Sequence, residues 1–280
     1  MTLLPAKHTV VVTGGFDNVR SRQFRFLHEA SRLGRLHVML WSDEALLALN
    51  GNAPRFLEAE RRYFVENIRY VSQVTIVQAA IDGNSLPEGW EGEPGLIWAV
   101  DEEQDTPAKK AYCAAHGIAY RVLTNSDLAG FPLDGLDAPA EKTTQKRAVV
   151  TGCYDWLHSG HVRFFEEASE FGDLFVIVGH DENLRLLKGE GHPLFPQDER
   201  RYMVQSIRFV KQALISSGSG WMDAEPEIDA LRPDYYVVNE DGDKLEKREF
   251  CAGHGLEYKI LKRLPKPGLP RRESTSLRGF

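Results

Sequence analysis

Residues 147–161 read RAVVTGCYDWLHSGH, and this stretch decides the fold. Arg147–Thr151 is a short apolar run typical of a buried strand. Gly152 indicates a turn after it, and an amphipathic helix is expected near Gly160–Phe171. A strand, a turn with glycine and a helix make the opening of a βα unit. The stretch therefore predicts an α/β fold with parallel strands.

The same pattern occurs twice in the chain. A shift of 138 residues places Val10–Glu44 on Ala148–Glu182. After one extra residue in the second copy Glu60–Tyr63 meets Glu199–Tyr202, and Cys113 meets Cys251 at the first offset again. Two similar helices that matched by chance would not keep one register along a whole domain. The sequence therefore predicts an internal duplication.

Further short apolar runs alternate with helical patterns in the second copy. Strands are expected at Leu174–Val178, Ala213–Ser216, Tyr235–Asn239 and Glu257–Leu261, and helices at Gln197–Phe209, Glu227–Leu231 and Lys244–Gly253. We predict two tandem Rossmann-like, doubly wound parallel-sheet domains of the α/β class, related by duplication. The first occupies residues 1–126 and the second residues 145–280, with a linker rich in Asp, Pro, Gly and Ala at 127–144.

Length, charge and composition narrow the class of protein. A chain of 280 residues with 42% hydrophobic and 27% charged residues suits two globular domains. The net charge of -7 disfavours a general nucleic-acid binder, and no apolar run approaches the length of a membrane span. The N-terminus shows no signal-peptide pattern, and the three cysteines lack the spacing of a disulfide framework or metal site. We therefore expect a cytoplasmic protein.

Two histidines three residues apart stand where the helix begins. Both imidazoles of His158 and His161 can face one way on the first helical turn, and Gly160 lets a phosphate approach the backbone. The carboxyl end of a strand followed by a helix N-terminus is a favourable anion site. There, two imidazoles could stabilise charge on a phosphate under attack. Two unrelated surface histidines are the plainer reading, and a zinc site would need further ligands, for which the spacing is absent.

The string GCYDWLHSGH at 152–161 resembles the HxGH signature of the cytidylyltransferase-like nucleotidyltransferase superfamily. The resemblance continues through Lys188-Gly189 and the run from Phe195 to Val210, which is similar to phosphoethanolamine and glycerol-3-phosphate cytidylyltransferases. It ends at Ser274–Arg278, which resembles the family's closing Ser/Thr-rich motif. The resemblance implies transfer of a nucleoside monophosphate from a nucleoside triphosphate to a small phosphorylated acceptor, with release of pyrophosphate.

The resemblance also implies roles for single residues. His158 and His161 would bind the triphosphate and stabilise the transition state. Lys188, in a loop flanked by glycine, would close over the phosphates, and Arg200 matches the family's arginine at the start of the second long helix. The plainer alternatives are a solvated loop lysine and a surface helix charge.

A wider set is expected around the nucleotide. Its members are Gly152, Cys153, Tyr154, Gly160, Asn239, Ser274, Thr275 and Ser276, with Asp155, Glu240, Asp241, Arg272 and Arg278 as further candidates. The three hydroxyl residues have the pattern of a helix N-cap, so a plain cap is their alternative. Asp155 is expected to shape the turn, and Glu240 and Asp241 to contact a ribose, a base or the acceptor, unless they form only an acidic loop. Mg²⁺ is expected to come with the triphosphate, and no dedicated protein metal site is visible.

The first copy lacks the histidine pattern. Arg20, Arg22 and Gln23 stand opposite His158, Gly160 and His161, and Asn50 stands opposite Lys188. We predict a catalytically silent domain that forms an intramolecular pseudo-dimer with the active one; the whole chain could also form a homodimer. Phosphoethanolamine cytidylyltransferase resembles this arrangement with the domain order reversed. The two arginines could still bind a regulatory anion.

The nucleotide and the acceptor are less well defined than the reaction class. The run around Lys188 favours CTP, whereas the closing ESTSLR segment at 273–278 also resembles the ending of ATP-using adenylyltransferases. We expect a cytidylyltransferase, with an adenylyltransferase as the alternative and a non-catalytic nucleotide sensor as a third reading. Acceptors in these branches include phosphoethanolamine, polyol phosphates, sugar phosphates, flavin mononucleotide and pantetheine phosphate.

Overall fold

The protein is described by a computed structural model that covers residues 8–78, 82–90, 93–134 and 144–277, without the side chains of Thr275 and Ser276. The chain divides into two compact units, Met1–Gly130 and Phe131–Phe280. Of the linker predicted at 127–144, residues 135–143 lie outside the described ranges. None of the helices in these ranges is long and apolar enough to cross a membrane.

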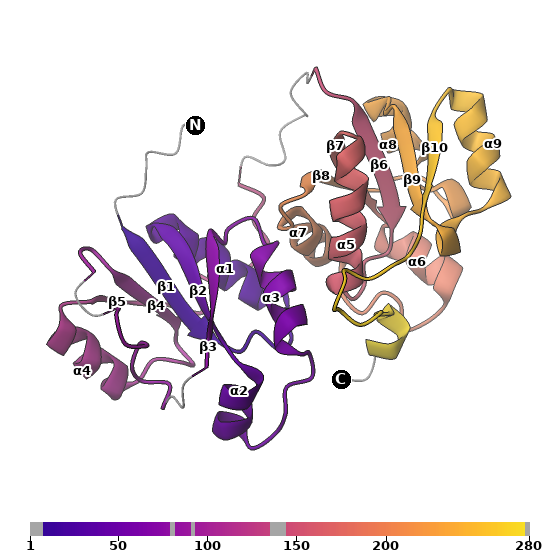
Figure 1. Ribbon diagram of the computed structural model, residues 1–280. Helices are drawn as coiled ribbons and strands as arrows, with labels where there is room; N and C mark the ends of the chain where they lie inside the picture. The colour runs from indigo at the N-terminus through magenta and orange to yellow at the C-terminus, as the bar shows by residue number, and fades with distance from the viewer. Residues whose placement is uncertain (1–7, 79–81, 91–92, 135–143, 278–280) are drawn as a thin grey trace. The chain divides into compact units, whose positions relative to one another are not determined.

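The N-terminal unit is built on one parallel sheet (Figure 1). Its elements in chain order are β1 (Thr9–Gly14), α1 (Ser21–Leu33), β2 (Arg35–Trp41), α2 (Asp43–Asn50), α3 (Glu58–Glu66), β3 (Gln73–Val77), β4 (Ile97–Asp101), α4 (Pro107–His116) and β5 (Ala119–Leu123). The strands lie in the order β3-β2-β1-β4-β5, and neighbouring strands are parallel.

The C-terminal unit has the same arrangement. Its elements are β6 (Arg147–Gly152), α5 (Ser159–Ala168), η1 (Ser169–Phe171), β7 (Asp173–Val178), α6 (Asp181–Lys188), α7 (Gln197–Gln205), β8 (Val210–Ile215), η2 (Gly220–Met222), α8 (Glu225–Leu231), β9 (Tyr235–Asn239), η3 (Glu240–Gly242), α9 (Leu245–His254), β10 (Glu257–Leu261) and η4 (Ser274–Leu277). The order β10-β9-β6-β7-β8 is again fully parallel. The prediction of an α/β protein with parallel, Rossmann-like sheets is confirmed.

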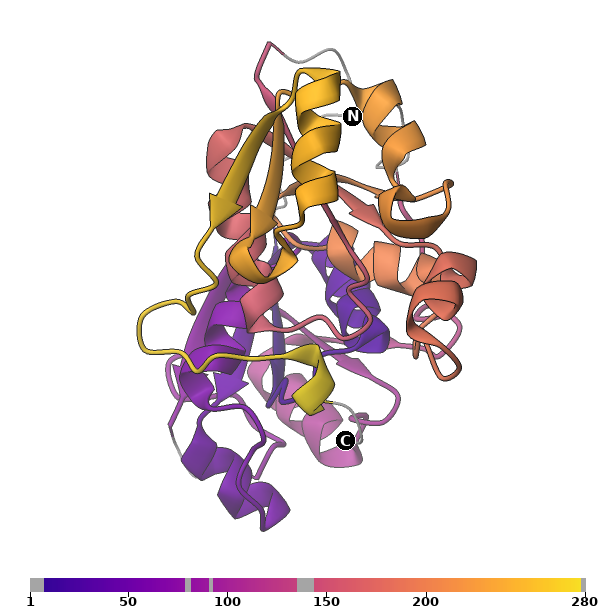
Figure 2. The same ribbon diagram turned by 90° about the vertical axis from the view of Figure 1, so that its right-hand side faces the viewer.

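Apolar strands explain why helices cover this sheet on both faces (Figures 1 and 2). Side chains alternate between the two faces of a strand, so Val149, Phe175 and Tyr236 point to one face. There they form a buried cluster with Ile228 of α8 and Cys251 of α9. A sheet buried in this way leaves its strand ends as the places where polar groups can gather.

Several predicted boundaries were wrong, and the helix α6 was not predicted. The helix predicted over Gln197–Phe209 ends at Gln205. The next residue, Ser206, caps it, and its hydroxyl donates to the Tyr202 carbonyl in the last turn. The following strand begins at Val210 rather than at Ala213. Lys188, expected in a loop, is the last residue of α6, and only the glycine after it leaves the helix, with a φ of 83°.

Candidate active site

A pocket of about 580 Å³ opens at the carboxyl ends of β6 and β9. The chain runs from β6 to β7 in one direction and returns through β9 on the other side of β6, which makes this a switch point in strand order. Crevices of this kind are where open α/β sheets bind ligands. The lining residues are Thr151, Gly152, Cys153, Tyr154, Asp155, His158, Gly160, His161, Phe164, Lys188, His192, Val237, Val238, Asn239, Asp241, Gly242, Lys247, Arg263 and Ser274.

The two histidines cap the first turn of α5. His158 is the N-cap residue, and its Nδ1 accepts a hydrogen bond from the Gly160 amide at 3.1 Å. Nδ1 of His161 accepts from the His158 amide at 3.4 Å, and the ring centroids lie 3.9 Å apart. Because both Nδ1 atoms accept backbone N–H groups, each neutral ring carries its proton on Nε2. The Nε2 of His158 is buried and has no hydrogen-bond partner among the described residues.

Burial keeps both rings uncharged. His158 is 4% exposed, and burial, with smaller effects of His161 and Arg263, holds its pKa well below the usual value. Burial, with the nearby cations Arg263 and Lys188, lowers the pKa of His161 to about 3. Near neutral pH the site therefore offers two neutral N–H donors whose tautomers are fixed by the backbone.

Glycine is required at two positions of this turn. A Cβ on Gly160 would lie 2.9 Å from Cε1 of His158, so any larger residue would displace the ring that caps the helix. A Cβ on Gly152 would lie 2.7 Å from the ring of Tyr154, which folds back over the strand end because its own φ is 51°. Left-handed backbone is uncommon for a tyrosine and places its ring against His161, with centroids 5.4 Å apart.

The other predicted residues are only partly brought together. Lys188, Asn239, Asp241 and Ser274 line the pocket with the histidines. Glu240 and Arg272 are not among the lining residues, although Arg272 lines a small neighbouring cavity that shares Gly160, Asn239 and Arg263. Arg278 and the side chains of Thr275 and Ser276 lie outside the description.

Comparisons with known proteins identify similar sequences. Residues 149–248 match the family described as Cytidylyltransferase-like. FAD synthase of Aciduliprofundum boonei is 36% identical over 125 residues, which cover 44% of this chain and 80% of that protein. The bifunctional protein HldE of Geobacter sulfurreducens is 36% identical over 150 residues, 52% of this chain but only 29% of HldE. A solved lipopolysaccharide core biosynthesis protein from Thermoplasma volcanium is 22% identical, covering 46% of this chain and 99% of that one, with a TM-score of 0.36.

The chain belongs to the cytidylyltransferase-like nucleotidyltransferases. The family assignment follows from the FAD synthase match, which covers 80% of that relative's length, and from the family model, which matches within the C-terminal unit. In this chain the pocket is lined by His158 and His161 at the start of α5.

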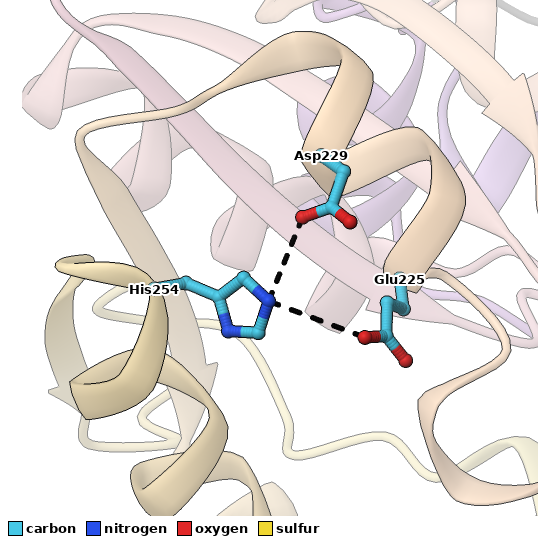
Figure 3. A group of neighbouring side chains, drawn as sticks. All are labelled: Glu225, Asp229 and His254. Atoms are coloured by element: carbon cyan, nitrogen blue, oxygen red, sulfur yellow. Dashed lines mark ion pairs between the residues drawn. The ribbon is translucent and has the colours of Figure 1, made fainter.

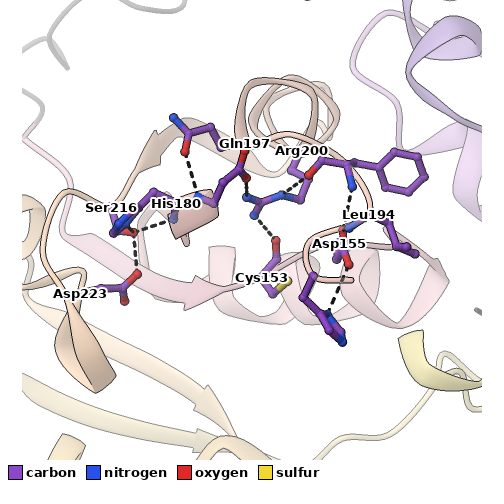
Figure 4. Close-up of polar contacts among 11 residues, drawn as sticks. Cys153, Asp155, His180, Leu194, Gln197, Arg200, Ser216 and Asp223 are labelled. Atoms are coloured by element: carbon purple, nitrogen blue, oxygen red, sulfur yellow. Dashed lines mark hydrogen bonds and ion pairs between the residues drawn. The ribbon is translucent and has the colours of Figure 1, made fainter. Parts of the chain in front are cut away.

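Arg200 of this nucleotidyltransferase is not in the pocket lining, although the sequence suggested a catalytic role. Its side chain is fully buried. The guanidinium donates to the carbonyls of Cys153 and Phe195 at 2.7 and 2.9 Å and to Asp181 at 2.6 Å (Figure 4). A group held by three acceptors in the protein interior is placed to hold loops together, not to contact substrate.

Asp155 binds the same segment that Arg200 binds, and we call the two residues with their partners the arginine clamp. Its Oδ1 accepts the amides of Leu194 and Phe195 at 2.7 and 3.1 Å (Figure 4). Asp155 and Arg200 thus join the histidine turn to the segment that precedes α7. The structure gives Asp155 the turn-shaping contacts expected of it, while its second oxygen lies 3.9 Å from Nδ1 of His192.

Three lining residues with basic side chains were not predicted from the sequence. Arg263 pairs with Asp241 and donates to the Arg272 carbonyl at 3.3 Å, so it places a cation beside the histidines. Lys247 donates to the Gly242 carbonyl at 3.1 Å. His192 is the third. All three come from segments distant in sequence from the histidine motif, and no local pattern marks them.

The N-terminal unit of this nucleotidyltransferase has a closely similar clamp without the histidines. Asp17 accepts the amides of Arg55 and Phe56, both at 2.8 Å. Arg61 donates to the carbonyls of Phe56, Gly15 and Trp41 and to Asp43. At the helix mouth Arg20 and Gln23 stand where the other unit has imidazoles, and the Arg20 amide donates to the Gln23 side chain at 2.9 Å.

Proposed function

We propose that the C-terminal unit transfers a nucleoside monophosphate from a nucleoside triphosphate to a small phosphorylated acceptor. The observation that carries this proposal is the pair of buried, neutral imidazoles whose Nδ1 atoms are held by backbone amides at the mouth of α5. A buried donor without an acceptor costs about 1–3 kcal/mol. An oxygen of the nucleotide's phosphate chain would satisfy the free Nε2–H of His158.

The chain's own groups support an in-line displacement. An acceptor phosphate oxygen attacks the α-phosphorus, the bond to the β-phosphate oxygen breaks, and pyrophosphate leaves. His158 and His161 donate hydrogen bonds to oxygens that gain charge, and Lys188 and Arg263 supply positive charge nearby. No proton has to move from either ring, in keeping with their lowered pKa values.

Mg²⁺ fits this site as part of the nucleotide complex rather than as a resident ion. The carboxylates in the pocket lining are Asp155, bound to two backbone amides, and Asp241, paired with Arg263. Mg²⁺ is commonly held through substrate phosphates, waters and one or two carboxylates. When bound it offsets the charge of the triphosphate, while the two imidazoles contact the same phosphate chain.

For the nucleotide we favour ATP, with adenylyl transfer to an acceptor of the flavin mononucleotide class. The FAD synthases of Aciduliprofundum boonei and Thermococcus kodakarensis match this chain over about four fifths of their own length, and FAD carries an adenylyl group. The segment 273–278 also resembles adenylyltransferase endings. CTP is the second candidate, because the Lys188-Gly189 run resembles cytidylyltransferases.

We also propose that the N-terminal unit is a duplicated copy without catalytic activity. The equal strand orders support duplication, as does the pair of clamps built from Asp17 with Arg61 and from Asp155 with Arg200. The loss of chemistry is supported by Arg20 and Gln23 at the helix mouth, where neither side chain can act as a neutral imidazole donor.

Pyrophosphate release tests these proposals together. The full chain is incubated with Mg²⁺ and either ATP or CTP, and flavin mononucleotide, phosphoethanolamine, glycerol 3-phosphate and a sugar phosphate are offered in turn. Release with one pair, and its loss in a His158→Gln variant, is the expected result. Nucleotide binding without release from any pair would contradict transfer and favour a sensor.

A further inference from the structure

Three side chains on the outer surface of the C-terminal unit converge on one point. They are Glu225 and Asp229, one turn apart on α8, and His254 at the end of α9 (Figure 3). One ligand atom from each lies within 4.8 Å of the other two, and all three residues are exposed. No other group of this kind occurs in the ranges that the structure describes. The three residues are absent from the pocket lining, so the cluster does not belong to the proposed active site.

Phe250 fixes the orientation of the His254 imidazole. Its Nδ1 lies 2.8 Å from the Phe250 carbonyl and so carries the proton that this acceptor requires. The ring also stacks on Phe250, with centroids 4.0 Å apart and planes inclined by 27°. In the neutral ring this leaves the Nε2 lone pair directed at the carboxylates. Histidines that bind metals usually have their other nitrogen fixed in this manner.

The distances favour a shared cation. Nε2 lies 3.6 Å from Asp229 and 4.0 Å from Glu225, longer than the ~2.7–2.9 Å of a charge-assisted hydrogen bond. Tetrahedral Zn²⁺ with bonds of about 2.0–2.1 Å separates its ligand atoms by about 3.3–3.4 Å. Exposed carboxylates can close the difference by small rotations.

We propose that Glu225, Asp229 and His254 form a surface site for a divalent transition metal, with Zn²⁺ as the best match. An imidazole with two carboxylates suits Zn²⁺ and disfavours Mg²⁺ or Ca²⁺, which take oxygen ligands. Three protein ligands leave the fourth position to water. The bound ion would connect α8 to α9. This inference does not depend on the proposed nucleotidyl transfer.

Calorimetric titration of the full chain with Zn²⁺ tests the site. The wild type is expected to bind one equivalent in the micromolar range, and His254→Ala to weaken that event by at least about tenfold. Mg²⁺ in large excess should not compete. His116→Ala is the matched control: Nδ1 of His116 lies 2.8 Å from the Tyr112 carbonyl at the end of α4, yet His116 belongs to no comparable group. It should bind Zn²⁺ like the wild type.

A second variant distinguishes loss of the site from misfolding of His254→Ala and from Zn²⁺ bound at the pocket histidines. Glu225→Gln combined with Asp229→Asn keeps both side-chain shapes and removes the anionic ligands, so it should also weaken binding. Zn²⁺ should raise the melting temperature of the wild type and not that of either ligand variant. Equal Zn²⁺ isotherms for wild type, His254→Ala and the double variant would overturn the site, as would a wild type without micromolar binding.

Discussion

Replacing Gly160 by alanine tests the geometry of the histidine turn with one added methyl group. The new Cβ would stand 2.9 Å from Cε1 and 3.0 Å from Nδ1 of His158. The ring is 4% exposed, so it has to leave the position where Nδ1 accepts the Gly160 amide. Removing one preorganised donor to a developing charge costs about 10²–10³ in turnover, or ~2.7–4 kcal/mol. We expect Gly160→Ala to lose about this much activity while it remains folded.

Gly253 provides the matched control because it too is a helical glycine, and a Cβ there meets nothing within 4 Å. Gly253→Ala should stabilise α9 by about 0.5–1 kcal/mol and raise the melting temperature by about 2–4 °C. Its turnover should equal that of the wild type. The assays are initial rates of pyrophosphate release and thermal unfolding followed by circular dichroism. A folded Gly160→Ala protein with wild-type turnover would refute the assigned role of the His158 ring.

Three further predictions follow from the same contacts. His161→Ala should lower turnover by about 10²–10³ with an unchanged circular dichroism spectrum, whereas Gln23→Ala should leave pyrophosphate release unaltered. Arg200→Met and Arg61→Met should each destabilise their unit by at least about 1–3 kcal/mol in urea unfolding, because each removes the donor from backbone carbonyls and from a half-buried carboxylate, but only the first should reduce turnover. Stability should also fall in acid: the folded pKa of His161 is about 3, so below pH 6.5 the unfolded chain binds a proton that the folded chain does not. This costs about 1.4 kcal/mol per pH unit, and urea unfolding of His161→Gln should show a shallower decline between pH 6.5 and 5.

The sequence predicted the features that depend on short-range patterns. The strands Tyr235–Asn239 and Glu257–Leu261 have the predicted bounds, because short, mostly apolar runs between helical patterns mark them. The histidine turn after β6 could be anticipated because a strand, a glycine and a helix start are all local signals. Boundaries such as the end of α7 depend on the hydroxyl of Ser206 bonding back to the helix, which periodicity does not report.

The contributions of distant segments to the pocket could not be predicted. Arg263 and Lys247 reach the histidines only because β9 lies beside β6, and a pairing between strands is not encoded near either residue. Arg200 shows the opposite error. The family resemblance implied a catalytic role for it, whereas its burial and three acceptors are visible only once the chain is folded.

Because both units contain a similar clamp, the same arginine substitution can be compared between them within one chain. A substitution at Arg61 measures how much a buried guanidinium contributes to the free energy of unfolding in a unit that we propose has no catalytic activity. The matching change at Arg200 should cost a similar free energy of unfolding, so a loss of turnover in folded Arg200→Met protein would report what this arginine contributes to the active site.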